Sequence, residues 1–218
     1  MFIGYAQLPE EMEKNMRIYL AIIVLMAAAG TAMAQRSDQP GDIPKGKAKV
    51  AEVQVSSDTL QLRYIANGKI VGASNSRFSG TFFLSEDRDI VLSSGLVFPV
   101  DYDLGRLSLL IGPQVYAAFL SDPNEEVMAL SLGADLRFVL NKKLDFAVSG
   151  QAYYAPNILT FGSADELVDL SARAEIALAK NFQAFGGYRW FHVDLTSTQG
   201  NSRKTLQNQV FFGLAYRF

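Results

Sequence analysis

The chain has 218 residues, no cysteine, a single histidine and 49% hydrophobic residues, with a formal net charge of −2 at pH 7. Nucleic-acid-binding proteins normally carry a basic face, so this nearly neutral balance argues against that class of partner. One histidine and no cysteine cannot build a zinc site of the usual composition, and no disulfide framework can form.

The first 34 residues have the three parts of a secretory signal peptide. Lys14 and Arg17 precede an apolar run at 18–29, which is followed by an Ala-x-Ala motif ending at Ala34. This order predicts cleavage after Ala34, and Met16 is an alternative start because the pattern is complete from there. The apolar run is shorter than the ~20 residues that a membrane-spanning helix needs, so an anchor is disfavoured.

Residues 35–47 are polar and rich in proline and glycine, which predicts a flexible periplasmic leader. From residue 48 to the end, apolar residues alternate with small or polar ones at a period of two, as they do in β-strands. The clearest example sets Met128, Leu130, Leu132, Ala134, Leu136, Phe138 and Leu140 against Ser131, Gly133, Asp135 and Arg137.

The turns between the alternating segments fall into two classes. Short turns lie at Asp101, Asn141 and Lys180, and longer polar loops begin at Ser121, Pro156 and Thr196. Outer-membrane barrels place short turns on the periplasmic side and longer loops outside. Counted back from a last strand that ends in the periplasm, every short turn falls on the periplasmic side. The pattern therefore predicts an all-β fold, an antiparallel transmembrane β-barrel over residues 48–218.

The number of strands follows from the same alternation. Eight strands run from about Ile70 to Phe218, and residues 49–66 add either a pair split at Ser57-Asp58 or a plug-like segment. Because both termini should be periplasmic, the count should be even. We predict ten strands, with eight as the alternative.

The chain ends on Phe218, with Tyr216 on the same strand face. A terminal aromatic residue in a last strand resembles the signal by which the outer-membrane assembly machinery recognises its clients. We therefore predict a location in the cell outer membrane. The expected partners are outer-membrane lipid, lipopolysaccharide and the assembly machinery, and the expected oligomeric state is a monomer.

The polar face of the strands predicts a charged lumen. Its candidate lining residues are Glu52, Arg63, Arg77, Asp135, Arg137, Asp145, Arg173, Glu175, Arg189 and Arg217. An unpaired buried charge is costly, and barrels of about eight strands are only just wide enough for their own side chains. Opposite charges that pair and fill the lumen are therefore favoured over a thin polar pore or a ligand pocket.

Catalysis would require a positioned base beside a nucleophile. His192 is close in sequence to Asp194 and Ser197, but it shares its parity with Tyr188 and Trp190. That parity places His192 on the lipid side, in the outer aromatic girdle. We predict no catalytic residue, no cofactor and no metal site.

The acidic segment with Asp122, Glu125 and Glu126 is predicted to be a solvated loop rather than a site for a divalent cation.

Three motifs carry a resemblance to a known family. They are Gly150-Gln151-Ala152-Tyr153-Tyr154-Ala155-Pro156, the loop Ser163-Ala164-Asp165, and Gly187-Tyr188-Arg189-Trp190-Phe191. With the Gly-Leu-x-Phe-Pro stretch at 95–99, they make most of the mature chain similar to the YfaZ family of proteobacterial outer-membrane proteins. The resemblance implies an outer-membrane barrel and brings with it no established activity.

The expected function is therefore that of an outer-membrane β-barrel with a structural or narrow-channel, porin-like role. Two other classes stay open. One is an outer-membrane enzyme that hydrolyses lipid or peptide at the barrel rim, and the other is a soluble periplasmic β-barrel binder.

Overall fold

The computed structural model describes residues 49–100, 106–122, 124–141, 145–197 and 200–218. The expected signal peptide and leader lie outside the described residues, as does the turn at Asp101. The strands are β1 (Lys49–Val55), β2 (Thr59–Asn67), β3 (Arg77–Ser85), β4 (Ile90–Pro99), β5 (Leu107–Ser121), β6 (Asn124–Asn141), β7 (Phe146–Ala155), β8 (Thr160–Gly162), β9 (Ala164–Ala179), β10 (Phe182–Ser197) and β11 (Gly200–Arg217). Two short 3-10 helices accompany them, η1 (Gly68–Val71) and η2 (Asn157–Leu159).

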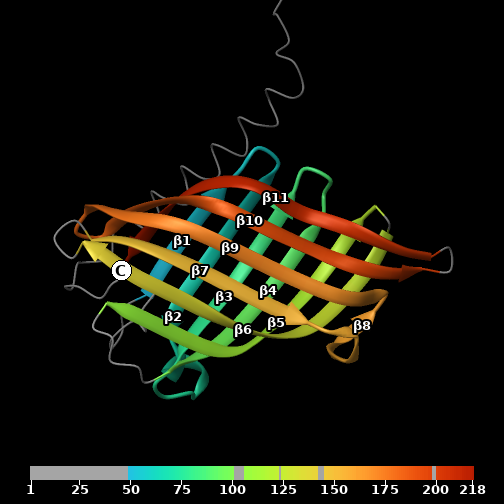
Figure 1. Ribbon diagram of the computed structural model, residues 1–218, viewed down its shortest axis with the longest axis horizontal. Helices are drawn as coiled ribbons and strands as arrows, with labels where there is room; N and C mark the ends of the chain where they lie inside the picture. Colours follow the sequence, from blue (N-terminus) through green and yellow to red (C-terminus); the bar gives the residue numbers. More distant parts are fainter. Residues whose placement is uncertain (1–48, 101–105, 123, 142–144, 198–199) are drawn as a thin grey trace, which may run out of the picture. The chain divides into compact units, whose positions relative to one another are not determined.

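Ten of these strands form a closed antiparallel barrel (Figure 1). Each strand pairs with its neighbour in sequence order, and β1 pairs with β11 from Val50↔Arg217 to Val55↔Phe212, which closes the sheet. The predicted ten-strand barrel is thus confirmed, with its first hairpin split at Ser57-Asp58. The three residues of β8 pair with the outer part of β6 and add no strand to the barrel wall.

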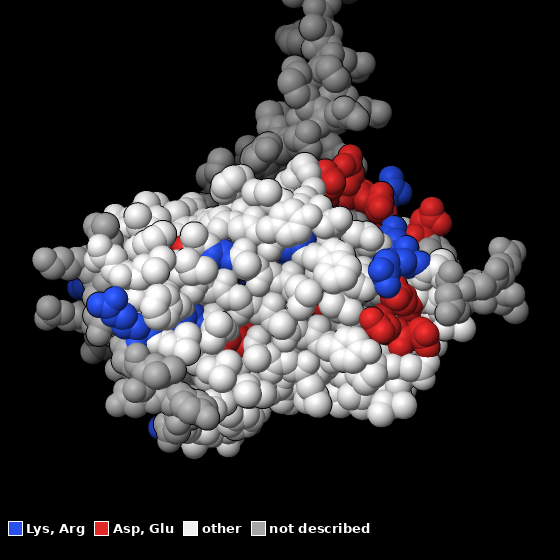
Figure 2. Space-filling model, in the orientation of Figure 1, with Lys and Arg blue, Asp and Glu red and all other residues white. Residues whose placement is uncertain are grey.

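The outer surface of the barrel is apolar. Its exposed large side chains include Leu92, Ile111, Phe119, Met128, Leu132, Leu136, Phe138, Val148, Leu178, Phe182, Val210 and Phe212. Figure 2 shows a middle zone that is mostly uncharged, with only small charged patches visible between the other atoms, and larger groups of charged side chains toward the two ends of the barrel. Such a band is stable when lipid covers it, which makes the barrel a transmembrane one. Among the described residues there is no helix long and apolar enough to span a membrane.

The wall of the barrel has unequal height. β1 has 7 residues and β2 and β3 have 9 each, whereas β6 and β11 have 18. About 9–11 tilted residues suffice to cross a bilayer, so the outer halves of the long strands extend past the membrane. β10 and β11 reach farthest toward the right-hand end in Figure 1, opposite the end at which the chain terminates.

Two of the predicted outer loops are largely strand. β5 continues to Ser121 and β6 begins at Asn124, and these two residues pair with each other. β10 and β11 likewise pair up to Ser197↔Gly200. The polar residues of these segments indicated exposure to water, and a strand ladder above the membrane satisfies their backbone as well as a loop would. The segment after Pro156 instead holds η2 and β8.

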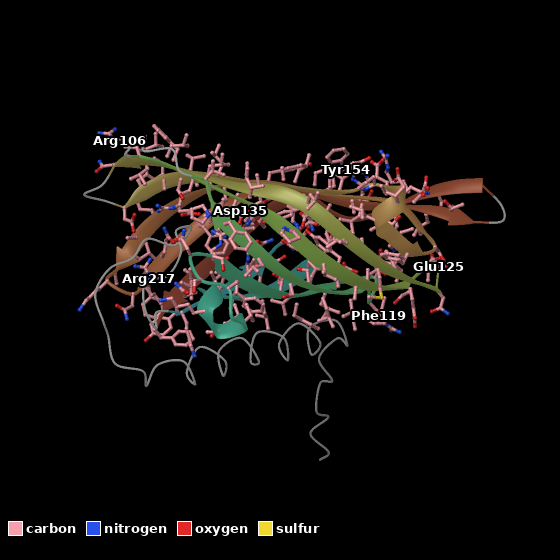
Figure 3. All side chains as sticks on the ribbon, turned by 90° about the horizontal axis from the view of Figure 1, so that it is seen from below. Arg106, Phe119, Glu125, Asp135, Tyr154 and Arg217 are labelled. Carbon is pink, nitrogen blue, oxygen red and sulfur yellow. The ribbon has the colours of Figure 1, made fainter. Side chains whose placement is uncertain are left out.

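The interior is layered along the barrel axis. Charged residues of the middle section lie between two apolar ends, and Figure 3 shows Asp135 inside the barrel while Tyr154 and Phe119 lie on its outside. The apolar plug, as we call the layer at the outer end, consists of Phe83, Val91, Tyr116, Ala118, Leu120, Val127, Ala129, Ala155, Ala164, Leu167, Phe191, Val193, Leu195 and Leu206. The inner end holds Val50, Ile65, Phe185, Phe211 and Ala215.

A charge placed on the lipid face tests the membrane position. Leu136 is 44% exposed and lies on the outer surface of β6 at the level of the charged lumen. Leu136→Arg is expected to lower the free energy of unfolding in lipid vesicles by about 2–4 kcal/mol, because the charge is then at the bilayer midplane. Met128→Arg, nearer the outer end of the same strand, should cost only about 0–1 kcal/mol. Equal costs at the two positions would contradict the assigned membrane level.

Candidate functional site: the charged lumen

Arg173 on β9 is the centre of the largest ion-pair group in the lumen. Its Nη1 and Nη2 donate to the two carboxylate oxygens of Glu52 on β1, each at 3.0 Å. Its Nε donates to Glu175 Oε1 at 2.9 Å, and its guanidinium carbon lies 4.5 Å from the ring centre of Phe185. Because β1 and β9 are not neighbours in the sheet, the Arg173 side chain connects two separate strands of the wall through the lumen.

Glu175 is 1% exposed and collects donors from several strands. Arg137 Nε on β6 donates to Glu175 Oε2 at 3.0 Å, and Ser149 Oγ on β7 donates to Oε1 at 2.5 Å. Arg137 also reaches Asp145 Oδ1 through Nη2 at 3.3 Å. A buried carboxylate held by two guanidinium groups and a hydroxyl is fully compensated, as a buried charge must be.

A second group surrounds Asp135 on β6. Arg77 on β3 forms an ion pair with this carboxylate across the lumen. Gln151 Nε2 donates to Asp135 Oδ1 at 3.0 Å, and Tyr153 Oη donates to the same oxygen at 2.9 Å. The group therefore joins β3 to β6 and β7, from which it is separated in the sheet by β4 and β5.

Arg63 on β2 borders this group but makes no ion pair with any described residue. Its Nη1 donates to Gln151 Oε1 at 2.9 Å, while its buried Nε has no hydrogen-bond partner within the described part of the chain. The Arg63 residue is 8% exposed. The middle of the lumen thus carries a local excess of positive charge.

The third group lies closest to the apolar plug. Arg189 on β10 forms a bidentate pair with Asp169 on β9, with Nε–Oδ1 and Nη2–Oδ2 distances of 2.8 and 2.7 Å. Tyr116 Oη donates to Asp169 Oδ2 at 2.9 Å, and Arg189 Nη1 donates to Gln61 Oε1 at 2.5 Å. The Arg189 guanidinium stacks on the Phe191 ring of the plug at 4.5 Å, which joins the polar and apolar layers.

The structure brings Arg63, Asp135, Arg137, Arg173, Glu175 and Arg189 together in the middle of the lumen. Asp145 and Arg217 lie lower, where they line a cavity of about 30 Å³ at the inner mouth. Arg106 and Arg217 mark this end of the barrel in Figure 3, opposite Glu125.

Asp169, Tyr116 and Gln61 were absent from the predicted lining. Asp169 shares its parity with Arg173 and Glu175, so the signal for its inward position was present in the sequence. For Tyr116 and Gln61 the sequence predicted only a position on a strand. It did not predict their contacts with Asp169 and Arg189, because such contacts depend on the register of distant strands.

The cavities between the ion pairs are small. One near Gln61, Arg63 and Arg189 has a volume of about 20 Å³, and one near Arg77, Asp135 and Glu175 also has about 20 Å³. A single water needs ~10–15 Å³ of such volume. Each cavity therefore has room for about one water, and no larger solute fits without side-chain movement.

The outer mouth is bridged by an ion pair above the short first hairpin. Lys204 Nζ on β11 lies 3.2 Å from both Asp87 Oδ2 and Asp89 Oδ2 in the turn between β3 and β4. Partial burial disfavours the charged ammonium, but the hydrogen bonds to Asp89 and Asp87 outweigh it and raise the pKa of Lys204 above its ordinary value. The contact links the long strand β11 to the turn that follows the short strand β3.

Comparison with known proteins identifies the family of this chain. The family model described as YfaZ precursor matches residues 48–218. The chain belongs to the YfaZ family. The match covers the whole barrel and confirms the resemblance seen in the Tyr-Tyr-Ala-Pro and Gly-Tyr-Arg motifs. No curated protein sequence matches this family member significantly.

Several solved structures are similar to this YfaZ-family chain. A bacterial polysaccharide outer membrane secretin aligns with 12% identity and a TM-score of 0.46, over 81% of this chain and 67% of that one. The KdgM porin in complex with disordered oligogalacturonate aligns with 10% identity and a TM-score of 0.43, over 78% and 99% of the two chains. The NanC porin aligns with 9% identity and a TM-score of 0.36, over 79% and 98%.

Proposed function

We propose that this YfaZ-family protein is an outer-membrane barrel with a structural role, and that its resting lumen is closed to solutes. The observation that carries the proposal is the continuous filling of the lumen. Paired charges occupy its middle section, the apolar plug occupies its outer end, and the three cavities described above have volumes of only about 20–30 Å³.

The location in the outer membrane is supported by the signal-peptide pattern, the apolar outer band and the family membership. An apolar band of this kind requires lipid around it, and we propose membrane lipid and lipopolysaccharide as the partners that supply it. Tyr216 and Phe218, at the end of the closing strand, would be presented to the assembly machinery. Because the ten-strand wall closes on itself, a single chain satisfies its own strand edges at the membrane level, which supports a monomer.

A soluble periplasmic binder is disfavoured by the apolar outer surface, since monomeric soluble proteins rarely expose large apolar patches. A rim-active hydrolase stays an alternative without support from geometry. Among the described residues no serine or threonine hydroxyl forms a hydrogen bond with His192, and the side chain of Ser197 lies outside the described residues.

Conductance in planar lipid bilayers tests the closed lumen. The folded mature protein is expected to insert without producing stepwise ionic current, because the apolar plug offers ions no polar path. An open outer-membrane porin inserted under the same conditions is the control for detection. Steady single-channel steps from the unmodified protein would overturn the closed-lumen proposal.

A narrow porin-like channel is the second candidate, favoured by the positive charge of Arg63. If steps are observed, the unpaired guanidinium predicts a preference for anions over cations. Arg63→Gln should then reduce that preference, as measured by the reversal potential across a salt gradient. An unchanged reversal potential would show that Arg63 does not line the conducting path.

A further inference from the structure

A polar group lies on the outer surface of the barrel, away from the lumen. Glu166 on β9 is directly opposite Asp194 on β10, and His192 faces the same side two residues earlier. One ligand atom from each of these three side chains lies within 4.8 Å of the others. They occupy the outer ends of two neighbouring strands, beyond Trp190 along β10.

His192 is buried although it belongs to the outer surface. It is 1% exposed, and its ring centre lies 4.5 Å from that of Trp190. Its Nδ1 is buried without a hydrogen-bond partner in the described part of the chain. A buried polar atom left unpaired costs about 1–3 kcal/mol, a cost that a ligand bound to Nδ1 would remove.

Local backbone geometry fixes this position. The pairing of β10 with β11 shifts between Phe191 and His192, which are opposite Gln207 and Thr205, so that Leu206 is the extra residue of a bulge. A bulge re-aims the side chains next to it. Here the bulge accompanies the change from lumen-facing Phe191 to the buried imidazole.

The charges around the group favour a cation. Two carboxylates and one imidazole face one another, and Tyr154 Oη donates to Glu166 Oε2 at 3.2 Å, which orients that carboxylate. The positive partner present is Arg203, which donates to the two oxygens of Asp194 at 2.7 and 2.8 Å. The Arg203 side chain is 54% exposed, so it can move aside into solvent or share the carboxylate.

We propose that Glu166, His192 and Asp194 form a binding site for a divalent transition-metal ion of the Zn²⁺ type. An imidazole with carboxylate oxygens suits such ions, whereas Ca²⁺ takes oxygen ligands alone. Three protein ligands leave a fourth position for water or an external donor. The sequence predicted no metal site because one histidine without cysteine looked insufficient, but the strand register supplies the two carboxylates.

The chain carries its own probe for this site, because Trp190 is its only tryptophan. Titration of the folded mature protein in detergent with Ni²⁺ is expected to quench Trp190 fluorescence in a saturable manner. Zn²⁺ should relieve the quenching by competition, and Ca²⁺ at the same concentration should not. Quenching that rises linearly without saturation would be collisional and would overturn the proposal.

Variants separate binding from nonspecific effects. His192→Gln and Glu166→Gln should each weaken Ni²⁺ binding by at least about tenfold, in line with the losses that follow disruption of a metal site. Arg203→Gln should tighten it several-fold, because a competing cation is removed from Asp194. Glu86→Gln, an exposed acid in the turn between β3 and β4, is the matched control and should leave the titration unchanged. Circular dichroism confirms that each variant is folded, and saturable binding unaffected by His192→Gln would place the ion elsewhere and refute the site.

Discussion

Glu175→Ala is expected to lower the free energy of unfolding by about 3–5 kcal/mol, the cost of breaking a buried ion pair by removing one partner. Glu175 is 1% exposed and accepts from Arg137, Arg173 and Ser149. Its removal leaves two guanidinium groups facing each other in a lumen whose cavities admit about one water each. Equilibrium unfolding in urea, with the protein folded into lipid vesicles, measures the change.

Two further variants make this result specific to the buried pairs. Glu175→Gln keeps the acceptor oxygen and the side-chain volume, so it should recover part of the loss. Glu126→Ala removes an exposed acid from β6 and should change stability by no more than about 0.5 kcal/mol. If Glu175→Ala cost as little as Glu126→Ala, the lumen charges would be solvated by water and the barrel would not be filled.

Truncating the two phenylalanines at the base of the apolar plug is expected to open the lumen to ions. Phe191 is fully buried, its ring centre lies 5.9 Å from that of Phe83 and 5.8 Å from that of Tyr116, and it covers the Arg189 guanidinium. Each Phe→Ala change should cost about 3–5 kcal/mol of stability. Together they remove both rings that stack on Arg189, so the Phe83→Ala/Phe191→Ala protein should show current steps in planar bilayers where the unmodified protein shows none.

Phe212→Ala is the control for this experiment. Phe212 lies on β11 with 65% of its surface exposed on the lipid side, so its truncation leaves the lumen unchanged and should produce no current. A closed double variant would mean that the ion pairs below the plug block the path by themselves. Adding Arg189→Ser to the double variant would then distinguish a block by the upper ion pair from a block lower in the lumen.

The transmembrane barrel was predictable because its signal is local. Side chains alternate with a period of two along every strand, and the lipid face and the lumen face demand opposite polarity. Leu130, Leu132 and Leu136 therefore identified the outer surface, and Asp135 and Arg137 the inner one, without knowledge of any partner strand. The same alternation favoured a hairpin at Ser57-Asp58 over a plug-like segment.

The boundaries of the outer loops were less predictable. At Ser121 and Thr196 the residues become polar because the strands leave the membrane, while the strands themselves continue. Polar residues indicate that a segment is exposed to water, but they do not tell where a strand ends. A strand continues above the membrane when its neighbour is equally long and can pair with it. β5 with β6, and β10 with β11, satisfy that condition.

The sequence by itself determined the fold class and which face of each strand is polar, and it favoured ten strands over eight, because these depend on residue order along one strand. Only the tertiary structure decided which charges meet. Arg173 finds Glu52 at a separation of 121 positions, and Arg63 is left without a carboxylate. The same holds on the outer surface, where Glu166 joins His192 and Asp194 through the register of β9 against β10. Ion pairing and metal coordination require contact within a few ångströms, and in a closed barrel that contact is set by the register of all ten strands together.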